Sequence, residues 1–430
     1  MPTHGGERPE QAHSPGEFAP SSRESGHRYR WVILSVGVLA QAALAALQHG
    51  LPALGPILRT RFDLTLPEIG LVLASSNWGI MSTLLLWGAL ADRWGERLVI
   101  ATGLGGSAVA IIAASQAADV TELVLWLISA GALGSAASAA SGRAVMHWFS
   151  RRERGFALGI RQMAIPLGSA VAALSLPLIA AAAGLDAALF ALAGAAGLGA
   201  VCAALLLSSH PGASGEISLV VPLSPLRDGV LWRLAFCSGL LVCSQVAMNG
   251  FVVLLLTEYR GIALGPAALV LAAINLGGGA ARVFVGRLSD RSGRRLPPIR
   301  KQALWLASAL MASALLIDAP LPLLIPALVA AGVFALSWNG LAMTAAAEMA
   351  GHARAGLAIG LQGTVIRVVS AGAGVAFGFV VEQTGSWALA ILLLGLLPLI
   401  SYSLMAPLSG EEERRLLPLD PARPATSPPT

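Results

Sequence analysis

Twelve long apolar segments, separated by short polar stretches, constrain the fold of this chain more than any other feature. Each is long enough to cross roughly 30 Å of hydrocarbon as a helix. They run over residues 31–58, 67–90, 98–117, 122–146, 156–183, 186–207, 230–256, 265–288, 301–318, 321–345, 356–381 and 386–407, spans one to twelve. In lipid the backbone must satisfy its own polar groups, and the segments are too long and uniform for barrel strands. The sequence therefore predicts an all-α integral membrane protein with twelve transmembrane helices.

Composition supports a membrane protein. The 430 residues are 56% hydrophobic and only 12% charged. The net charge of +5 comes from arginines clustered between apolar segments, which is typical of membrane orientation rather than of a nucleic-acid surface. Cys202, Cys237 and Cys243 have no metal or redox spacing. We expect the lipid bilayer as a partner, and no nucleic acid, metal or cofactor.

Polar stretches predict the domain organisation. Residues 1–28 and 408–430 are polar and read as disordered tails. Residues 208–228 contain three prolines and predict a linker between a six-helix bundle at 29–207 and a second at 229–407. Most loop arginines fall on one side, which we expect to be cytoplasmic, as are both termini and the linker. The chain would be a multi-pass protein of the cell inner membrane.

The two predicted bundles repeat one another. When the chain is shifted by 198 residues, Leu71–Leu98 lies over Leu269–Leu296 with 13 of 28 positions identical. A shift of 200 places Gly50 on Gly250. Because each half has six spans, both halves begin on the same side of the membrane. Parallel repeats of this kind are typical of one class of transporter architecture.

The repeated loop carries a family resemblance. Residues 88–97 (GALADRWGER) closely resemble the loop signature of the major facilitator superfamily, and residues 286–295 (GRLSDRSGRR) repeat it. Glycines permit close helix approach and tight turns, and an aspartate can bind helix N-terminal amides or arginine. The alternative is that the arginines act only as positive-inside anchors. The predicted conformational latch comprises Gly88, Asp92, Arg93, Gly95, Arg97, Gly286, Asp290, Arg291 and Gly293.

A second signature bears on the substrate. Residues 147–159 (HWFSRRERGFALG) are similar to the junction between spans four and five of monocarboxylate-type and related organic-anion carriers. Span one, however, lacks the acidic-Gly-aromatic start of true monocarboxylate carriers. Span five has only Ile165-Pro166-Leu167-Gly168 where drug antiporters carry a Gly-Pro-x-x-Gly-Gly motif. That departure counts against drug/proton exchange.

Four arginines lie within predicted spans, where a charge is costly and usually functional. Arg367 lies near the middle of span eleven, and no acidic residue occupies similar depth. It needs an anion, so we predict that it contacts the substrate; the alternative is an arginine satisfied by backbone carbonyls. Arg161 is a second candidate. Arg143 and Arg282 lie nearer the cytoplasmic ends, where snorkelling or a salt bridge to Glu348 is expected.

Polar side chains at mid-depth complete the predicted site. Asn77 and Asn275 are repeat partners that either bind substrate or bond across helices. Trp78 and Trp338 could form an aromatic wall of the site and Asn339 a polar contact in it. The alternative is that the tryptophans only pack between helices. The resemblance places Gln41, Gln48, His49, Gln245 and Asn249 on the cavity-lining faces of spans one and seven. The substrate-binding set is Arg367, Arg161, Asn77, Trp78, Asn275, Trp338, Asn339, Gln48 and Asn249.

The function implied is secondary active transport by alternating access, and we expect uptake of a small organic anion together with a proton. His49 and Glu348 are the proton-coupling candidates. The sequence contains no phosphate loop and no nucleophile–base constellation, so an enzyme or an ATP-driven pump is not expected. The alternatives are efflux of drugs or metabolites by proton antiport, and a membrane receptor that senses without transporting. We expect the chain to act as a monomer.

Overall fold

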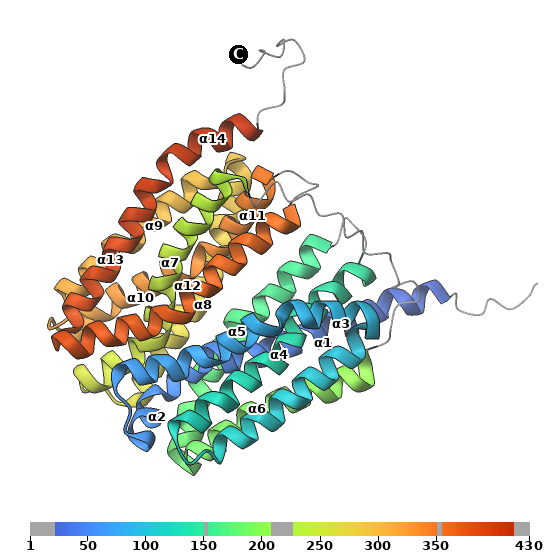
Figure 1. The fold of residues 1–430 in the computed structure, drawn as a ribbon, viewed down its shortest axis with the longest axis horizontal. Coiled ribbons are helices and arrows are strands. Elements are labelled where there is room, and N and C mark those ends of the chain that lie inside the picture. Colours follow the sequence, from blue (N-terminus) through green and yellow to red (C-terminus); the bar gives the residue numbers. More distant parts are fainter. Residues whose placement is uncertain (1–21, 150–153, 208–226, 351–354, 417–430) are drawn as a thin grey trace, which may run out of the picture.

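The computed structural model describes residues 22–149, 154–207, 227–350 and 355–416, and this part of the chain is helical, without strands. Figure 1 shows two helical bundles that lie side by side. Helices α1 to α6 form one bundle, and α7 to α13 form the other. The chain therefore has two halves, as the internal repeat predicts.

The first half contains spans one to six. Span one is built from α1 (Ser22–Ala45), a π-helical turn η1 (Ala46–Gly50), a 3-10 turn η2 (Leu51–Leu54) and α2 (Gly55–Phe62). Spans two and three form one element, α3 (Leu66–Ser115), which breaks at Gly95. The remaining spans are α4 (Val120–Trp148), α5 (Arg154–Ala183) and α6 (Leu185–Leu206).

The second half repeats this order. Span seven is α7 (Gly229–Leu254) with a π-helical end, η4 (Leu255–Tyr259), and spans eight and nine are α8 (Leu264–Ser292) and α9 (Leu296–Leu315). Span ten is divided into α10 (Leu321–Ser337) and α11 (Asn339–Ala350). Spans eleven and twelve are α12 (Ala355–Thr384) and α13 (Trp387–Leu404). A last helix, α14 (Ala406–Leu416), follows span twelve.

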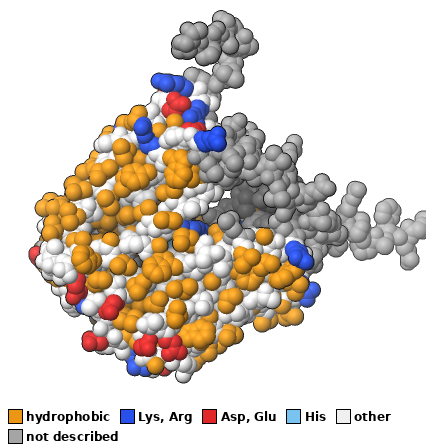
Figure 2. Space-filling model, viewed as in Figure 1, with side chains coloured by type: hydrophobic (Ala, Val, Ile, Leu, Met, Phe, Trp, Pro, Cys, Tyr) orange, Lys and Arg blue, Asp and Glu red, His pale blue; other side chains and the backbone are white. Residues whose placement is uncertain are grey.

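The apolar surface agrees with a membrane protein. Within the described helices, ten stretches are long and apolar enough to cross a membrane by length and composition. Two further spans, the first part of α3 and α9, pack against their neighbours as helices of the same bundles. Large side chains such as Leu205, Leu315 and Phe284 are mostly exposed. Figure 2 shows hydrophobic side chains spread over both halves, as expected for lipid-facing surfaces. The prediction of twelve transmembrane helices is confirmed.

Local chemistry explains where several helices begin and turn. Thr65 starts α3 with a capping box, since its hydroxyl accepts from the Glu68 amide while Glu68 binds the Thr65 amide. Gly95 has φ +79°, and Gly293, which ends α8, has φ +63°. Both lie in the two latch loops and adopt conformations that favour glycine. The turn that the sequence predicts after spans two and eight is therefore present in both halves.

The two halves touch at one end of the molecule. We call the end at which α1 begins and α14 lies the terminal face, and the opposite end the distal face. Near the distal face, an ion pair joins Arg59 to Glu258, and the Leu66 amide donates to the Glu382 carboxylate at 3.3 Å. Backbones also approach closely, because a Cβ on Gly70 would lie 2.7 Å from the Gly374 oxygen. Figure 2 shows a recess between the halves on the side of the termini.

Two predicted boundaries are wrong. Helix α1 begins at Ser22, although residues 1–28 were expected to be disordered. Residues 408–416 belong to α14, whose Glu412 is 1% exposed, instead of to a disordered tail. Both errors have the same cause, because a short polar helix leaves no apolar run in the sequence. Most of the predicted linker at 208–228 lies outside the described residues, and its last residues lead into α7.

Candidate functional site

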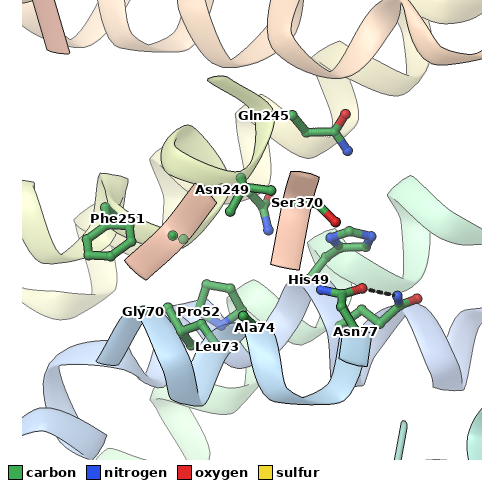
Figure 3. Close-up of a pocket in the computed structure, with 14 residues that line it drawn as sticks. His49, Pro52, Gly70, Leu73, Ala74, Asn77, Gln245, Asn249, Phe251 and Ser370 are labelled. Carbon is green, nitrogen blue, oxygen red and sulfur yellow. Dashed lines mark hydrogen bonds between the residues drawn. The ribbon is translucent and has the colours of Figure 1, made fainter. Parts of the chain in front are cut away.

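A pocket lies between the two halves, close to where they meet. Its space, including the open mouth, is about 480 Å³. Figure 3 shows that its walls come from spans one, two, seven and eleven, which are distant in sequence. The polar side chains among the lining residues are Gln48, His49, Asn77, Gln245, Asn249 and Ser370.

Span one is distorted where it meets the pocket. Gln48 and His49 lie in the π-helical turn η1, and Pro52 lies in the 3-10 turn η2 that follows. Proline has no amide hydrogen and clashes with the preceding turn, so a regular helix cannot continue through it. π-Helical turns of this kind are frequent at functional sites. Both of these adjacent polar residues line the pocket.

Amide side chains are paired in both halves. Gln48 Nε2 donates to Asn77 Oδ1 at 2.7 Å, joining spans one and two. Asn275 Nδ2 donates to Asn249 Oδ1 at 3.2 Å, joining spans eight and seven. Asn77 and Asn275 are equivalent in the internal repeat, but Asn77 accepts its hydrogen bond whereas Asn275 donates. These four predicted site residues therefore lie together, and three of them line the pocket.

Trp78 and Trp338, the predicted aromatic wall, lie in different surroundings and do not form one wall. Trp78 Nε1 donates to the Ala371 carbonyl at 3.0 Å and so links the two halves between α3 and α12. Trp338 is fully buried and packs in the core, and it is not among the residues that line the pocket. Asn339 Nδ2 donates to Gln245 Oε1 at 2.7 Å and therefore supports a lining residue from behind.

Two arginines inside the bundles, Arg161 and Arg282, have uncharged hydrogen-bond partners. Arg161 donates to Gln41 Oε1 at 3.0 Å and to the Ser141 hydroxyl at 3.1 Å. Arg282 donates to the Leu336 carbonyl at 2.7 Å. The Nε groups of Arg161 and Arg282 are buried without a hydrogen-bond partner among the described residues. Neither guanidinium is neutralised by a carboxylate in the part of the chain that the structure describes.

The expected salt bridge between Arg282 and Glu348 is wrong. Glu348 instead binds Arg295 near the terminal face, with Nη2–Oε1 at 3.0 Å. Arg282 lies seven residues after Asn275, about two turns along the same face of α8, and within electrostatic range of His49. Helix rotation, which the sequence does not specify, directs Arg282 toward the interior. The side chain of Arg143 lies outside the described residues.

Arg367 is the arginine with the fewest contacts. Its side chain is half-buried and makes no hydrogen bond or ion pair with the residues that the structure describes. Ser370 and Gly374, three and seven residues further along α12, both line the pocket. Residues at this spacing share one helix face. Arg367 therefore lies on the pocket-facing side of α12, one turn toward the terminal face.

Sequence reasoning missed two features of this wall. Ser370 lines the pocket, and its hydroxyl donates to the Arg367 carbonyl at 2.9 Å. Gly70 and Gly374 both line the pocket, where their backbones meet. The three-residue spacing between Arg367 and Ser370 was a usable signal for the first. Nothing in the sequence pairs Gly70 with Gly374, because they lie in different halves.

The latch loop of the second half takes part in a charge network at the terminal face. Asp290 and Glu348 both bind Arg295, so the aspartate pairs with a nearby arginine as predicted. The amides at the start of α9, however, donate to Glu412 of α14, with 2.6 Å between the Arg295 nitrogen and Glu412 Oε1. The side chain of Asp92 lies outside the described residues. No described atom would lie within 4 Å of a Cβ on Gly88 or Gly286, so these glycines meet no neighbouring helix in this conformation.

An ion pair also holds the C-terminal end of α14 in place. Arg415 donates to Asp228 Oδ2 at 2.6 Å, and Asp228 in turn caps the first turn of α7. Hydrogen bonding from the Arg415 guanidinium holds the pKa of Asp228 below its ordinary value, against the opposing effect of partial burial. The last helix therefore contacts α9 and α11 and is joined to the start of α7 by this ion pair.

Comparison with known proteins identifies the family. The profile of the Major Facilitator Superfamily matches residues 33–301 and, in a second match, 234–429. The chain belongs to the major facilitator superfamily. An uncharacterized MFS-type transporter of Mycobacterium tuberculosis strain H37Rv is 32% identical over 388 residues, which cover 89% of this chain and 86% of the relative. The protein is thus a membrane transporter and not an enzyme, as the motifs predicted.

Other relatives of this transporter carry more specific names. A probable sulfoacetate transporter of Cupriavidus necator is 27% identical over 379 residues, covering 80% of this chain and 85% of that protein. Among solved structures, a D-xylose-proton symporter superposes with a TM-score of 0.76 at 16% identity, covering 90% of this chain and 99% of that one. A bacterial homologue of the lysosomal transporter Spinster, inward-facing and occupied, gives 0.72 at 13% identity over 90% and 97% of the two chains. At these identities the structural likeness shows the fold.

Proposed function

We propose that this transporter takes up a small organic anion together with a proton. One observation carries the anion: Arg367 is half-buried on the pocket-facing side of α12 and has no partner among the described residues. Holding an unpaired guanidinium inside a membrane costs at least about 2.5 kcal/mol. An anionic substrate would recover that cost, because a carboxylate matches the guanidinium through two parallel hydrogen bonds. Arg367 is therefore the main electrostatic contact in this proposal.

The surrounding charges favour the same conclusion. Arg161 and Arg282 bind neutral oxygens only, so the described centre of the molecule carries several positive charges and no balancing carboxylate. A positive interior attracts anions and repels cations. The relatives agree with an anionic cargo, since one is a probable sulfoacetate transporter and a shorter match is to a probable anion transporter of rice.

We assign the proton to His49. It lines the pocket, and it is the one titratable side chain among the lining residues. Glu348, the other candidate, is held by Arg295 at the terminal face and does not line the pocket. A proton on His49 would offset substrate charge, so that anion and proton enter together. Return of the empty carrier would then require His49 to be neutral.

The proposed orientation assigns the two faces of the molecule to the two sides of the membrane, and the inward proton gradient would set the direction of transport. Loop arginines gather at the terminal face, which we place in the cytoplasm of a cell with this protein in its inner membrane. The distal contacts described above then form a closed outer gate, and the recess opens inward. Substrate would enter when the distal contacts part and leave when they re-form, with the two halves rocking around the pocket.

Uptake into proteoliposomes tests this function. Purified protein is reconstituted, an acidic outside pH is imposed, and labelled carboxylates and sulfonates are compared with neutral and cationic solutes of similar size. We expect accumulation of an anion that collapses with the pH gradient and is lost in Arg367→Ala. Arg300→Ala is the matched control, because Arg300 packs over the Tyr402 ring away from the pocket. Accumulation of neutral or cationic solutes alone, or anion uptake indifferent to the gradient, would overturn the proposal.

A further inference from the structure

The amide groups around the pocket present an excess of hydrogen-bond donors. Asn275 Nδ2 donates one hydrogen to the Leu271 carbonyl at 3.0 Å and the other to Asn249 Oδ1. The backbone carbonyl fixes which end of Asn275 is the nitrogen, so its partner atom on Asn249 must be the oxygen. The amino group of Asn249, which lines the pocket, is therefore left to face a ligand. The side-chain oxygen of Asn249 is already bonded within the protein, and its amino group remains as a donor for a ligand.

Two further amides follow the same arrangement. Gln245 Oε1 accepts from Asn339, and Asn77 Oδ1 accepts from Gln48. The amino groups of Gln245 and Asn77 make no hydrogen bond with the residues that the structure describes. Figure 3 shows Asn77, Asn249 and His49 around one space, with Gln245 one turn further along span seven. No carboxylate lines this space.

Such a pocket suits a group that accepts hydrogen bonds and does not donate them. An alkyl end would leave buried amino groups without partners, which is costly. A ligand hydroxyl could accept a hydrogen bond from one of these donors, but its own hydrogen would require an acceptor. A carboxylate or sulfonate has several acceptor oxygens and no hydrogen, so it can accept from the amides of spans two and seven at once. Its charge would be balanced by a proton on His49, which lines the same space.

We infer that the substrate is a bifunctional anion, with one charged group at Arg367 and a second oxygen-rich anionic group among the amides of Asn77, Gln245 and Asn249. This inference rests on the proposed function, which supplies the first group. Arg367 lies three residues, about 4.5 Å along the helix, from Ser370 on the pocket wall. The two anionic groups are therefore joined by a short spacer. A simple monocarboxylate would occupy only one end of the site.

Ligand-induced stabilisation of the purified full-length protein tests this. Thermal midpoints are followed against concentration for matched pairs, propionate with succinate and propionate with 3-sulfopropionate, and lactate serves as the hydroxylated comparison. Binding to the folded state stabilises it by RT ln(1 + L/Kd), where L is the free ligand concentration, so the concentration dependence of the midpoint reports the affinity. We expect the bifunctional member to bind about tenfold or more tightly, because one hydrogen bond to a charged group is worth about that factor. Lactate should resemble propionate.

Two variants locate the second group. Asn249→Asp keeps the oxygen that binds Asn275 and replaces the free amino group with a charged oxygen, so the preference for bifunctional anions should fall to near unity. Gln362→Leu is the control, because Gln362 is a buried amide of α12 that binds Ser238 and does not line the pocket. It should keep the preference.

The outcomes separate this inference from the proposed function. If propionate or lactate binds as tightly as succinate and 3-sulfopropionate, or if Asn249→Asp keeps the preference, the second anionic group is refuted while anion transport stands. If no anion stabilises the protein but neutral or cationic solutes do, both proposals fail.

Discussion

Replacing Gly378 with alanine should hold the outer gate open. In the closed gate, a Cβ on Gly378 would lie 2.6 Å from the carbonyl carbon of Leu66, and closer still to its oxygen. Ordinary contact begins at 3.4 Å, so α12 and the start of α3 would have to separate by at least about 0.8 Å (3.4 − 2.6). Both sides of the contact are backbone and cannot rotate away. Overpacking of this kind costs about 1–3 kcal/mol, which would shift the balance between the two conformations about 5- to 150-fold toward the one with the distal face open.

Distances between spin labels measure this shift directly. Labels at Arg61 and Gln383, both exposed near the distal face, report the separation of the halves once the three native cysteines have been replaced. The variant should lengthen the main distance, whereas Gly372→Ala should not, because a Cβ there meets nothing within 4 Å. Distance distributions that are the same for both variants and the parent would show that the contact between Gly378 and Leu66 does not hold the gate closed.

Three further predictions concern the terminal face. Cysteines placed in either tail should resist a membrane-impermeant thiol reagent in intact cells, and labelling from outside would contradict the proposed orientation. Asp92→Asn and Asp290→Asn should impair transport more than ligand binding, since both loops lie far from the pocket; loss of binding with normal conformational exchange would refute the latch. Because Arg415 lowers the pKa of Asp228, this pair stabilises the protein above the ordinary aspartate pKa of about 3.9. The contribution should disappear as pH falls below that value, and Arg415→Ala should remove it at pH 7; unfolding profiles that do not differ between the two proteins would contradict it.

Much of the fold could be predicted because hydrophobicity and repetition determine it. The apolar segments located every span, and the match of Leu71–Leu98 with Leu269–Leu296 indicated two parallel halves. Shorter features were invisible to these signals. The interruption of span ten at Trp338 and the π-helical turn at Ala46–Gly50, which lies beside Pro52, change neither the hydrophobicity nor the repeat. Helix α14 depends on charge pairs with distant loops, such as Glu412 with the α9 amides.

The candidate site was only partly predictable. Repeat equivalence indicated Asn77 and Asn275, and the structure brings both into amide pairs beside the pocket. Depth along the chain suggested Arg367, but the same reasoning failed for Arg282, because depth does not specify which way a helix faces. Closure of the distal face could not be predicted either, because the same sequence must adopt both conformations of an alternating-access cycle.

The binding of an organic anion to Arg367→Lys tests the central claim most directly. Lysine keeps the positive charge but cannot form two parallel hydrogen bonds to a carboxylate. If Arg367 is the main contact, affinity measured by titration of the purified variant should fall about tenfold or more, because a hydrogen bond to a charged group is lost. The thermal midpoint without ligand should change little. Unchanged affinity in Arg367→Lys, or a best ligand that proves neutral or cationic, would show that Arg367 is a structural residue and that the anion assignment is wrong.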